Sequence, residues 1–138
     1  MYWLLEQLSV LAATKLKRAA RITKNSKFFK TIIEAIQEKK GDNIVSLDLR
    51  KIHEAVADFF IICEATSHTQ IRAISDFVET KVKKICAEVP YKQEGKMALQ
   101  WVLIDYVNIV VHIMLPESRH FYKLEDMWSD AQLQVHEG

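Results

Sequence analysis

The sequence contains little glycine, proline or cysteine, and each shortage excludes a class of protein. With three glycines and two prolines in 138 residues, the chain has no glycine-rich phosphate-binding loop, no proline-rich linker and no low-complexity tract. No internal repeat is visible. The composition also excludes collagen-like, disordered and disulfide-stabilised chains, while 49% hydrophobic residues suffice for one proper core. We expect one domain with an N-terminal extension.

Cysteine and histidine are not spaced for redox or metal chemistry. Cys63 lies in an apolar strand pattern and Cys86 in a helix pattern, and no C-x-x-C motif occurs. We therefore expect buried, reduced thiols and a reducing compartment. The five histidines show no i, i+4 pairing. We expect no metal site and no cofactor.

Long apolar runs are also missing. Residues 2–13 are apolar for only about a dozen positions, whereas a membrane span takes roughly 20. Their basic residues follow the run, the reverse of the order in a secretory signal. We assign residues 1–25 to a basic amphipathic extension and residues 26–138 to the domain. Three interpretations of the extension stay open: an amphipathic helix that packs on the domain or on a partner, an organelle-targeting segment, and residues translated from a misplaced start. We favour the first and the last.

The formal net charge of +1 hides an uneven distribution. Residues 1–30 carry seven basic side chains and one acidic side chain, a net charge of +6, so the remaining residues carry −5. An acidic domain suits a basic protein partner better than a phosphate backbone. We expect the domain to bind no nucleic acid directly, although the extension could touch it.

The hydrophobic pattern predicts helices and strands in a defined order. An amphipathic helix over residues 27–40 ends before Gly41, a strand follows at 43–49, and a continuous apolar run at 57–63 indicates a central strand buried on both faces. Ser67 and Gln70 form a capping box that starts a long helix, which ends before Pro90. A short helix is expected over residues 121–128. With the hairpin described next, this order predicts an α/β fold, a mixed β-sheet with flanking helices.

Two strongly apolar runs, 101–106 and 109–114, flank the turn Val107-Asn108 and predict a β-hairpin. If Tyr106 pairs with Ile109, one face is pure core, made of Val102, Ile104, Tyr106, Ile109, Val111 and Ile113. The opposite face carries Trp101, Leu103, Asp105, Val110, His112 and Met114. This second face is either a second buried layer or an apolar surface that a partner covers. Val107 resists the positive φ of a two-residue primed turn, so a longer turn or another turn type stays open.

Several ordered blocks resemble the ribosomal silencing factor family RsfS, also called the Iojap family, over roughly residues 30–131. The blocks are Asp58-Phe59-Phe60-Ile61-Ile62-Cys63, Thr66-Ser67, Gln70-Ile71, Ala73-Ile74, Glu94-Gly95, Trp101-Val102-Leu103-Ile104-Asp105-Tyr106, Val110-Val111-His112, Glu117, Arg119, Phe121-Tyr122, Leu124-Glu125 and Trp128. The chain departs from many members at Glu64-Ala65, where they have Ser-Gly or Thr-Gly, at Thr69, where they have arginine, and at Val107-Asn108, where they have Gly-Asp.

The resemblance implies a translation regulator rather than an enzyme. It implies binding to the large ribosomal subunit at the intersubunit face, through the protein numbered fourteen of that subunit, and a steric block on joining of the small subunit. It implies an α/β fold related in shape to nucleotidyltransferases without their catalytic motif. It places the protein in the bacterial cytoplasm, or less favourably in an organelle, and allows a homodimer when the protein is free.

We predict the partner-binding residues on the second hairpin face and beside it, on the assumption that this face is exposed. An aromatic anchor with a few polar neighbours is how interfaces concentrate binding energy. Trp101, Leu103 and Met114 supply an apolar patch, and Asp105, with Glu94 or Glu125, faces basic groups of the partner. The remaining predicted contacts are His112, Tyr122 and Trp128, although Tyr122 and Trp128 could simply pack the last helix.

The alternative function is a nucleotide-handling enzyme related to nucleotidyltransferases. Asp105 and His112 could form an acid–base pair, with Ser67 or Cys63 as nucleophile. Against this, Ser67 is explained as a helix cap, and an apolar strand raises the pKa of a thiol. No aspartates stand two residues apart as a magnesium site requires in that class. We therefore favour partner binding over catalysis.

Overall fold

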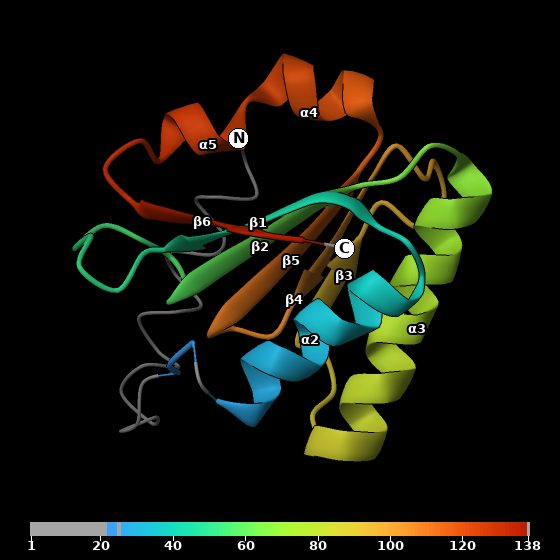
Figure 1. Ribbon diagram of the computed structural model, residues 1–138, viewed down its shortest axis with the longest axis horizontal. Helices are drawn as coiled ribbons and strands as arrows, with labels where there is room; N and C mark the ends of the chain where they lie inside the picture. Colours follow the sequence, from blue (N-terminus) through green and yellow to red (C-terminus); the bar gives the residue numbers. More distant parts are fainter. Residues whose placement is uncertain (1–21, 25, 138) are drawn as a thin grey trace.

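The computed structural model describes residues 22–24 and 26–137, in which helices pack against a twisted sheet (Figure 1). Most of the predicted extension, residues 1–21 and 25, lies outside the described residues. In chain order the elements are α2 (Lys27–Glu38), β1 (Asp42–Asp48), β2 (Phe59–Glu64), α3 (His68–Cys86), β3 (Lys92–Glu94), β4 (Trp101–Asp105), β5 (Ile109–Met114), α4 (Pro116–Tyr122), α5 (Leu124–Met127) and β6 (Gln132–His136).

The sheet has six strands in the order β3-β4-β5-β2-β1-β6. The central pair β2 and β5 is parallel, and every other neighbouring pair is antiparallel. The predicted mixed sheet with flanking helices is therefore confirmed. The two edge strands β3 and β6 were not predicted, because β3 spans three residues and all of β6 is exposed or half-buried, which leaves no strong period-2 signal.

Helices α2 and α3 cover one face of the sheet, as the ribbon shows (Figure 1). Phe29 of α2 packs edge-on against Phe59 of β2, with ring centroids 5.0 Å apart. Helix α2 ends two residues earlier than expected, and Lys40 rather than Gly41 takes the left-handed conformation, with φ 62°. Gly41 donates its N–H to the Ile36 carbonyl at 2.9 Å, and a Cβ there would collide with the Ile36 side chain.

The N-terminus of α3 confirms half of the predicted capping box. The Ser67 hydroxyl accepts a hydrogen bond from the Gln70 amide at 3.1 Å, as predicted. The Gln70 side chain does not return to the Ser67 amide. Its Oε1 accepts from the Thr66 amide at 2.8 Å, and its Nε2 donates to the Lys40 carbonyl at 3.0 Å. Gln70 thus ties the start of α3 to the end of α2.

A second hydrophobic cluster lies on the opposite face of the sheet. Phe60 and Ile62 of β2 point into it, while Phe59 and Ile61 point into the first cluster, so β2 is buried on both faces as predicted. The cover consists of the segment 49–57, which follows β1, and of Leu124 in α5. This second layer determines what the hairpin can present to solvent.

The predicted hairpin and its register are confirmed. Trp101 pairs with Met114 and Asp105 with Val110, and the Tyr106 amide donates to the Ile109 carbonyl at 2.9 Å. The turn keeps two residues, with φ of Val107 at 75° and an N–H···O bond from Asn108 to Tyr106 of 2.9 Å, a γ-turn. The sequence left open a longer turn or another turn type for Val107. The structure has another turn type.

The expected single helix over residues 121–128 is wrong. Lys123, with φ 47°, separates α4 from α5, and it serves as the C-cap of the first and the N-cap of the second. Helix α4 also starts earlier than predicted, with Pro116 in its first turn, where the missing N–H of proline costs nothing. Both helices lie on the side of the sheet opposite α2 and α3 (Figure 1), where Leu124 of α5 packs into the second cluster.

Candidate partner-binding surface

The second hairpin face is a buried layer, so the expectation that it is exposed is wrong for four predicted site residues. Leu103 is 4% exposed, and Asp105, His112 and Met114 are 0% exposed. The segment 49–57 and Leu124 cover this face, because β2 and β5 project Phe60, Ile62 and Val110 into the same layer. In the free molecule these four side chains are part of the core.

Asp105 supports the hairpin turn from inside. Its Oδ1 accepts a hydrogen bond from the Val107 amide at 2.7 Å, a contact typical of aspartate at turns. This bond helps to hold Val107 at the positive φ that its β-branched side chain disfavours. The structure thus gives Asp105 a role in the turn.

His112 supports the first residue of the hairpin, Trp101. The indole Nε1–H of Trp101 donates to Nδ1 of His112 at 3.0 Å, and Phe60 packs against the imidazole with centroids 4.7 Å apart. Burial lowers the pKa of His112 to about 3, so the imidazole is neutral and accepts this bond at neutral pH. A neutral imidazole committed to an indole is a support for Trp101 rather than a general base.

Trp101 is half-buried and forms the inner end of a row of three aromatic rings. Its ring centroid lies 4.7 Å from that of Tyr122, which lies 4.9 Å from that of Phe121. Exposure rises outwards, to 49% for Tyr122 and 77% for Phe121. We call Trp101, Tyr122 and Phe121 the aromatic ladder. Trp101 and Tyr122 are among the predicted contact residues, and Phe121 is not.

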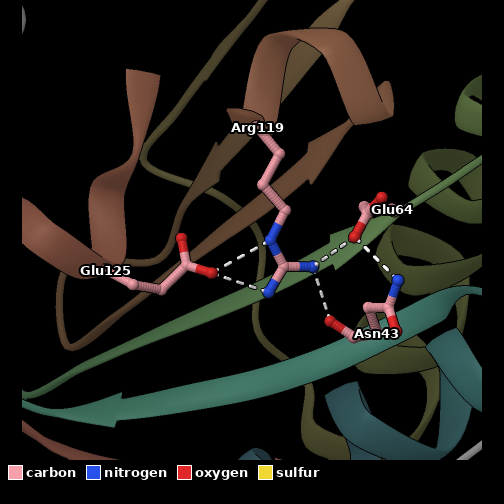
Figure 2. A network of polar contacts seen from close by, with 4 residues as sticks. All are labelled: Asn43, Glu64, Arg119 and Glu125. Atoms are coloured by element: carbon pink, nitrogen blue, oxygen red, sulfur yellow. Dashed lines mark hydrogen bonds and ion pairs between the residues drawn. The ribbon is translucent and has the colours of Figure 1, made fainter. Parts of the chain in front are cut away.

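Arg119 lies at the centre of a polar network between α4, α5 and the sheet (Figure 2). Its Nε and Nη2 donate to Glu125 Oε2 at 3.0 and 2.8 Å, and its Nη1 donates to Glu64 Oε2 at 3.1 Å and to the Asn43 carbonyl at 2.6 Å. The Asn43 amide also donates to Glu64 Oε2 at 2.9 Å. Glu125 therefore forms an ion pair with Arg119 of the same chain, whereas we expected it to face a basic group of the partner.

The last two predicted site residues lie apart from the ladder contacts. Glu94 is in the edge strand β3, opposite Leu103 in the register, and pairs with Lys92 at 3.2 Å. Trp128 is half-buried and packs against Phe60 with centroids 6.0 Å apart. Trp128 therefore belongs to the second core layer, which is the packing role that was the alternative for it.

The residues named for the enzyme alternative are occupied or shielded. Cys63 is fully buried, and desolvation raises the pKa of its thiol to about 12, which makes it a poor nucleophile. The Ser67 hydroxyl caps α3. Within residues 22–24 and 26–137, no three His, Cys, Asp or Glu side chains gather into a group that could hold a metal ion. Among the same residues, no helix has the length and apolarity to cross a bilayer.

Comparison with known proteins gives the family. Residues 22–137 match the family model described as ribosomal silencing factor during starvation, RsfS. A ribosomal silencing factor RsfS from Halalkalibacterium halodurans is 34% identical over 110 residues, 78% of this chain and 90% of the relative. The mouse mitochondrial assembly of ribosomal large subunit protein 1 is 38% identical over 74 residues, 52% of this chain and 32% of that protein. A crystal structure of a Chromobacterium violaceum protein superposes with a TM-score of 0.71 at 30% identity, covering 81% of this chain and 92% of that one. The chain therefore belongs to the RsfS family of ribosomal silencing factors.

Proposed function

We propose that this protein represses translation by binding the large ribosomal subunit at its intersubunit face, through the protein numbered fourteen of that subunit. Bound there, it sterically prevents the small subunit from joining. Membership of the RsfS family supports the proposal, as does the name of the mouse relative, which refers to the large ribosomal subunit. The aromatic ladder is the feature of the chain on which the proposal depends.

The ladder has the properties of an interface anchor. Interface energy concentrates in tryptophan, tyrosine and arginine residues that a partner buries completely. Phe121 and Tyr122 are exposed aromatic side chains whose burial by a partner would remove apolar surface from water. Trp101 stiffens the inner end, since its ring is hydrogen-bonded to the buried His112. A rigid aromatic surface loses little conformational entropy on binding.

The charge of the surrounding segment favours a basic partner. Residues 116–130 carry four acidic side chains and two basic ones, and one of the basic residues, Arg119, is already paired with Glu64 and Glu125. The net charge of −5 over residues 31–138 has the same sign. Complementary charge accelerates association, so binding should weaken as salt rises.

The proposed mechanism is occupancy and needs no covalent chemistry. The fraction of subunits blocked follows the ratio of the protein concentration to the dissociation constant. The protein would act wherever its ribosomes are, in a bacterial cytoplasm or in an organelle. No sequence of chemical steps has to be assigned to the buried Asp105 and His112.

Co-sedimentation with purified large subunits in sucrose gradients tests the proposal. Tyr122→Ala should weaken binding by about 2 kcal/mol, the size typical of an interface hot spot. Tyr91→Ala is the matched control, because Tyr91 is 55% exposed and lies outside the ladder. It should bind like the wild type. Equal binding by the wild type and Tyr122→Ala would remove the ladder from the interface.

Two further measurements separate the partner from the mechanism. Purified protein fourteen of the large subunit should bind the wild type in isolation and bind Tyr122→Ala more weakly. Light scattering should show that wild-type protein slows the joining of small to large subunits, and that Tyr122→Ala slows it less. Tight binding without any effect on joining would refute the steric block.

A further inference from the structure

We propose that Arg119 is a positioning residue, which holds α4 and α5 on the side of the sheet opposite α2 and α3, so that the aromatic ladder is assembled before a partner arrives. The proposal rests on the proposed function, because it concerns how the same surface becomes competent to bind. Its starting point is the weak anchoring of α4. None of the seven residues of this helix is buried, and a helix of this length is not stable by itself.

Arg119 compensates for that weak anchoring. Its side chain is only 11% exposed and reaches three other elements: Glu125 in α5, Glu64 at the end of β2 and the carbonyl of Asn43 in β1 (Figure 2). These elements are far apart in sequence, since Arg119 lies 76 residues after Asn43 and 55 after Glu64. One side chain therefore links both C-terminal helices to the two strands.

The chemistry of the contact requires a guanidinium. Arginine presents planar, diverging N–H donors, and here they serve two carboxylates and one carbonyl at the same time. A lysine ammonium is a point charge on a flexible stem and does not reproduce that fork. The side chains of Glu64 and Glu125 are 17% and 25% exposed, so solvent screens these pairs less than fully exposed ones.

The position of Arg119 in α4 carries its restraint to the ladder. Tyr122 lies three residues later, on the neighbouring turn, and the Lys123 amide closes the helix on the Arg119 carbonyl at 3.0 Å. Holding Arg119 thus holds Tyr122, whose ring centroid lies 4.7 Å from that of Trp101. With the helix fixed in the free protein, binding does not have to order it, and preorganisation of this kind strengthens binding.

The test compares Arg119→Gln with the wild type in two assays. In the free protein, NMR should show loss of the contact between the Tyr122 and Trp101 rings, a signature that a general loss of stability would not produce selectively. In co-sedimentation with large subunits, Arg119→Gln should bind about tenfold more weakly. Arg72→Gln removes the same charge from an exposed position of α3 and should leave both readouts unchanged.

A double mutant separates positioning from direct contact. If Arg119 acts through Tyr122, adding Arg119→Gln to Tyr122→Ala should weaken binding by no more than about twofold. A full tenfold penalty in the Tyr122→Ala background would overturn the proposal, as would wild-type binding by Arg119→Gln. If Arg119→Gln does not fold, Arg119→Lys and Glu125→Gln replace it, and both should lose part of the ring contact and part of the binding.

The failure of this proposal can be told apart from the failure of the proposed function. Absence of binding by the wild type refutes the function and the binding half of the proposal together. Strong binding by the wild type, lost in Tyr122→Ala but kept in Arg119→Gln, refutes the role of Arg119 alone. An intact ring contact in Arg119→Gln refutes the positioning step whatever the ribosome assay shows.

Discussion

The buried imidazole of His112 should make the stability of this protein fall as the solution is acidified from neutral pH. Burial lowers the pKa of His112 in the folded protein to about 3, from an ordinary value of 6.5. Between these two values the unfolded chain binds a proton at His112 that the folded protein excludes. The folded state therefore loses stability as pH falls from about 6.5 towards about 3, and full stability is present above about 6.5.

The size of the effect follows from one proton. Each pH unit within that window should lower the free energy of unfolding by about 1.4 kcal/mol, so acidification from about pH 7.5 to about pH 4.5 should remove about 2 to 3 kcal/mol. A small domain is stable by only about 5–15 kcal/mol, so this loss is large. His136, whose pKa is also lowered by burial, adds a change of the same sign.

Urea denaturation at a series of pH values, applied to the wild type and to His112→Gln, isolates the contribution of His112. The glutamine does not titrate and can still accept from the Trp101 indole, while His136 and the carboxylates are common to both proteins and cancel in the difference. The stability advantage of the wild type should shrink as pH falls. An advantage that stays constant from pH 7.5 to 4.5, or an imidazole that titrates near 6.5 by NMR in the folded protein, would refute the reasoning.

The remaining predictions concern the core and a helix cap. Burial raises the pKa of the Cys63 thiol to about 12, so Cys63 should resist iodoacetamide at pH 8 in the folded protein and react once urea unfolds it. Peptide mass mapping measures the labelling. Labelling in native buffer at the rate of a free cysteine would contradict the burial of Cys63. Ser67→Ala should lower the free energy of unfolding by about 1 kcal/mol, because the Gln70 amide loses its acceptor. Ser67→Asp can cap the helix in the same way and should retain most of the stability. Equal losses in both variants would argue against the cap.

Local signals in the sequence were sufficient for the central elements. The apolar runs on either side of Val107-Asn108 predicted both the hairpin and its register, since a side-chain period of two leaves only one pairing that collects the apolar residues on one face. The continuous run ending at Cys63 predicted a strand buried on both faces. The edge strands β3 and β6 were not predicted, because short strands with exposed side chains show neither an apolar run nor a clear alternation of apolar and polar residues.

The candidate site could be predicted only in part. Trp101 and Tyr122 were identified from residue type and from the resemblance to the RsfS family, and they do meet in the structure. Exposure could not be read from the same pattern. A face with leucine, methionine, one aspartate and one histidine has the same sequence pattern whether a partner or the chain itself covers it. Here the cover is Leu124 together with the segment 49–57, which lies more than 40 residues before the hairpin.

The sequence by itself determined the two long helices, the hairpin, the mixed character of the sheet and the family, because periodicity, caps and ordered residue blocks act over short stretches of chain. The tertiary structure alone decided that Asp105 and His112 are buried supports, that Phe121 is the outermost ring, and that Arg119 joins α4 to strands 55 and 76 residues earlier in the chain. Burial and ion pairing depend on which distant segments the fold brings together, and that information lies in no local pattern.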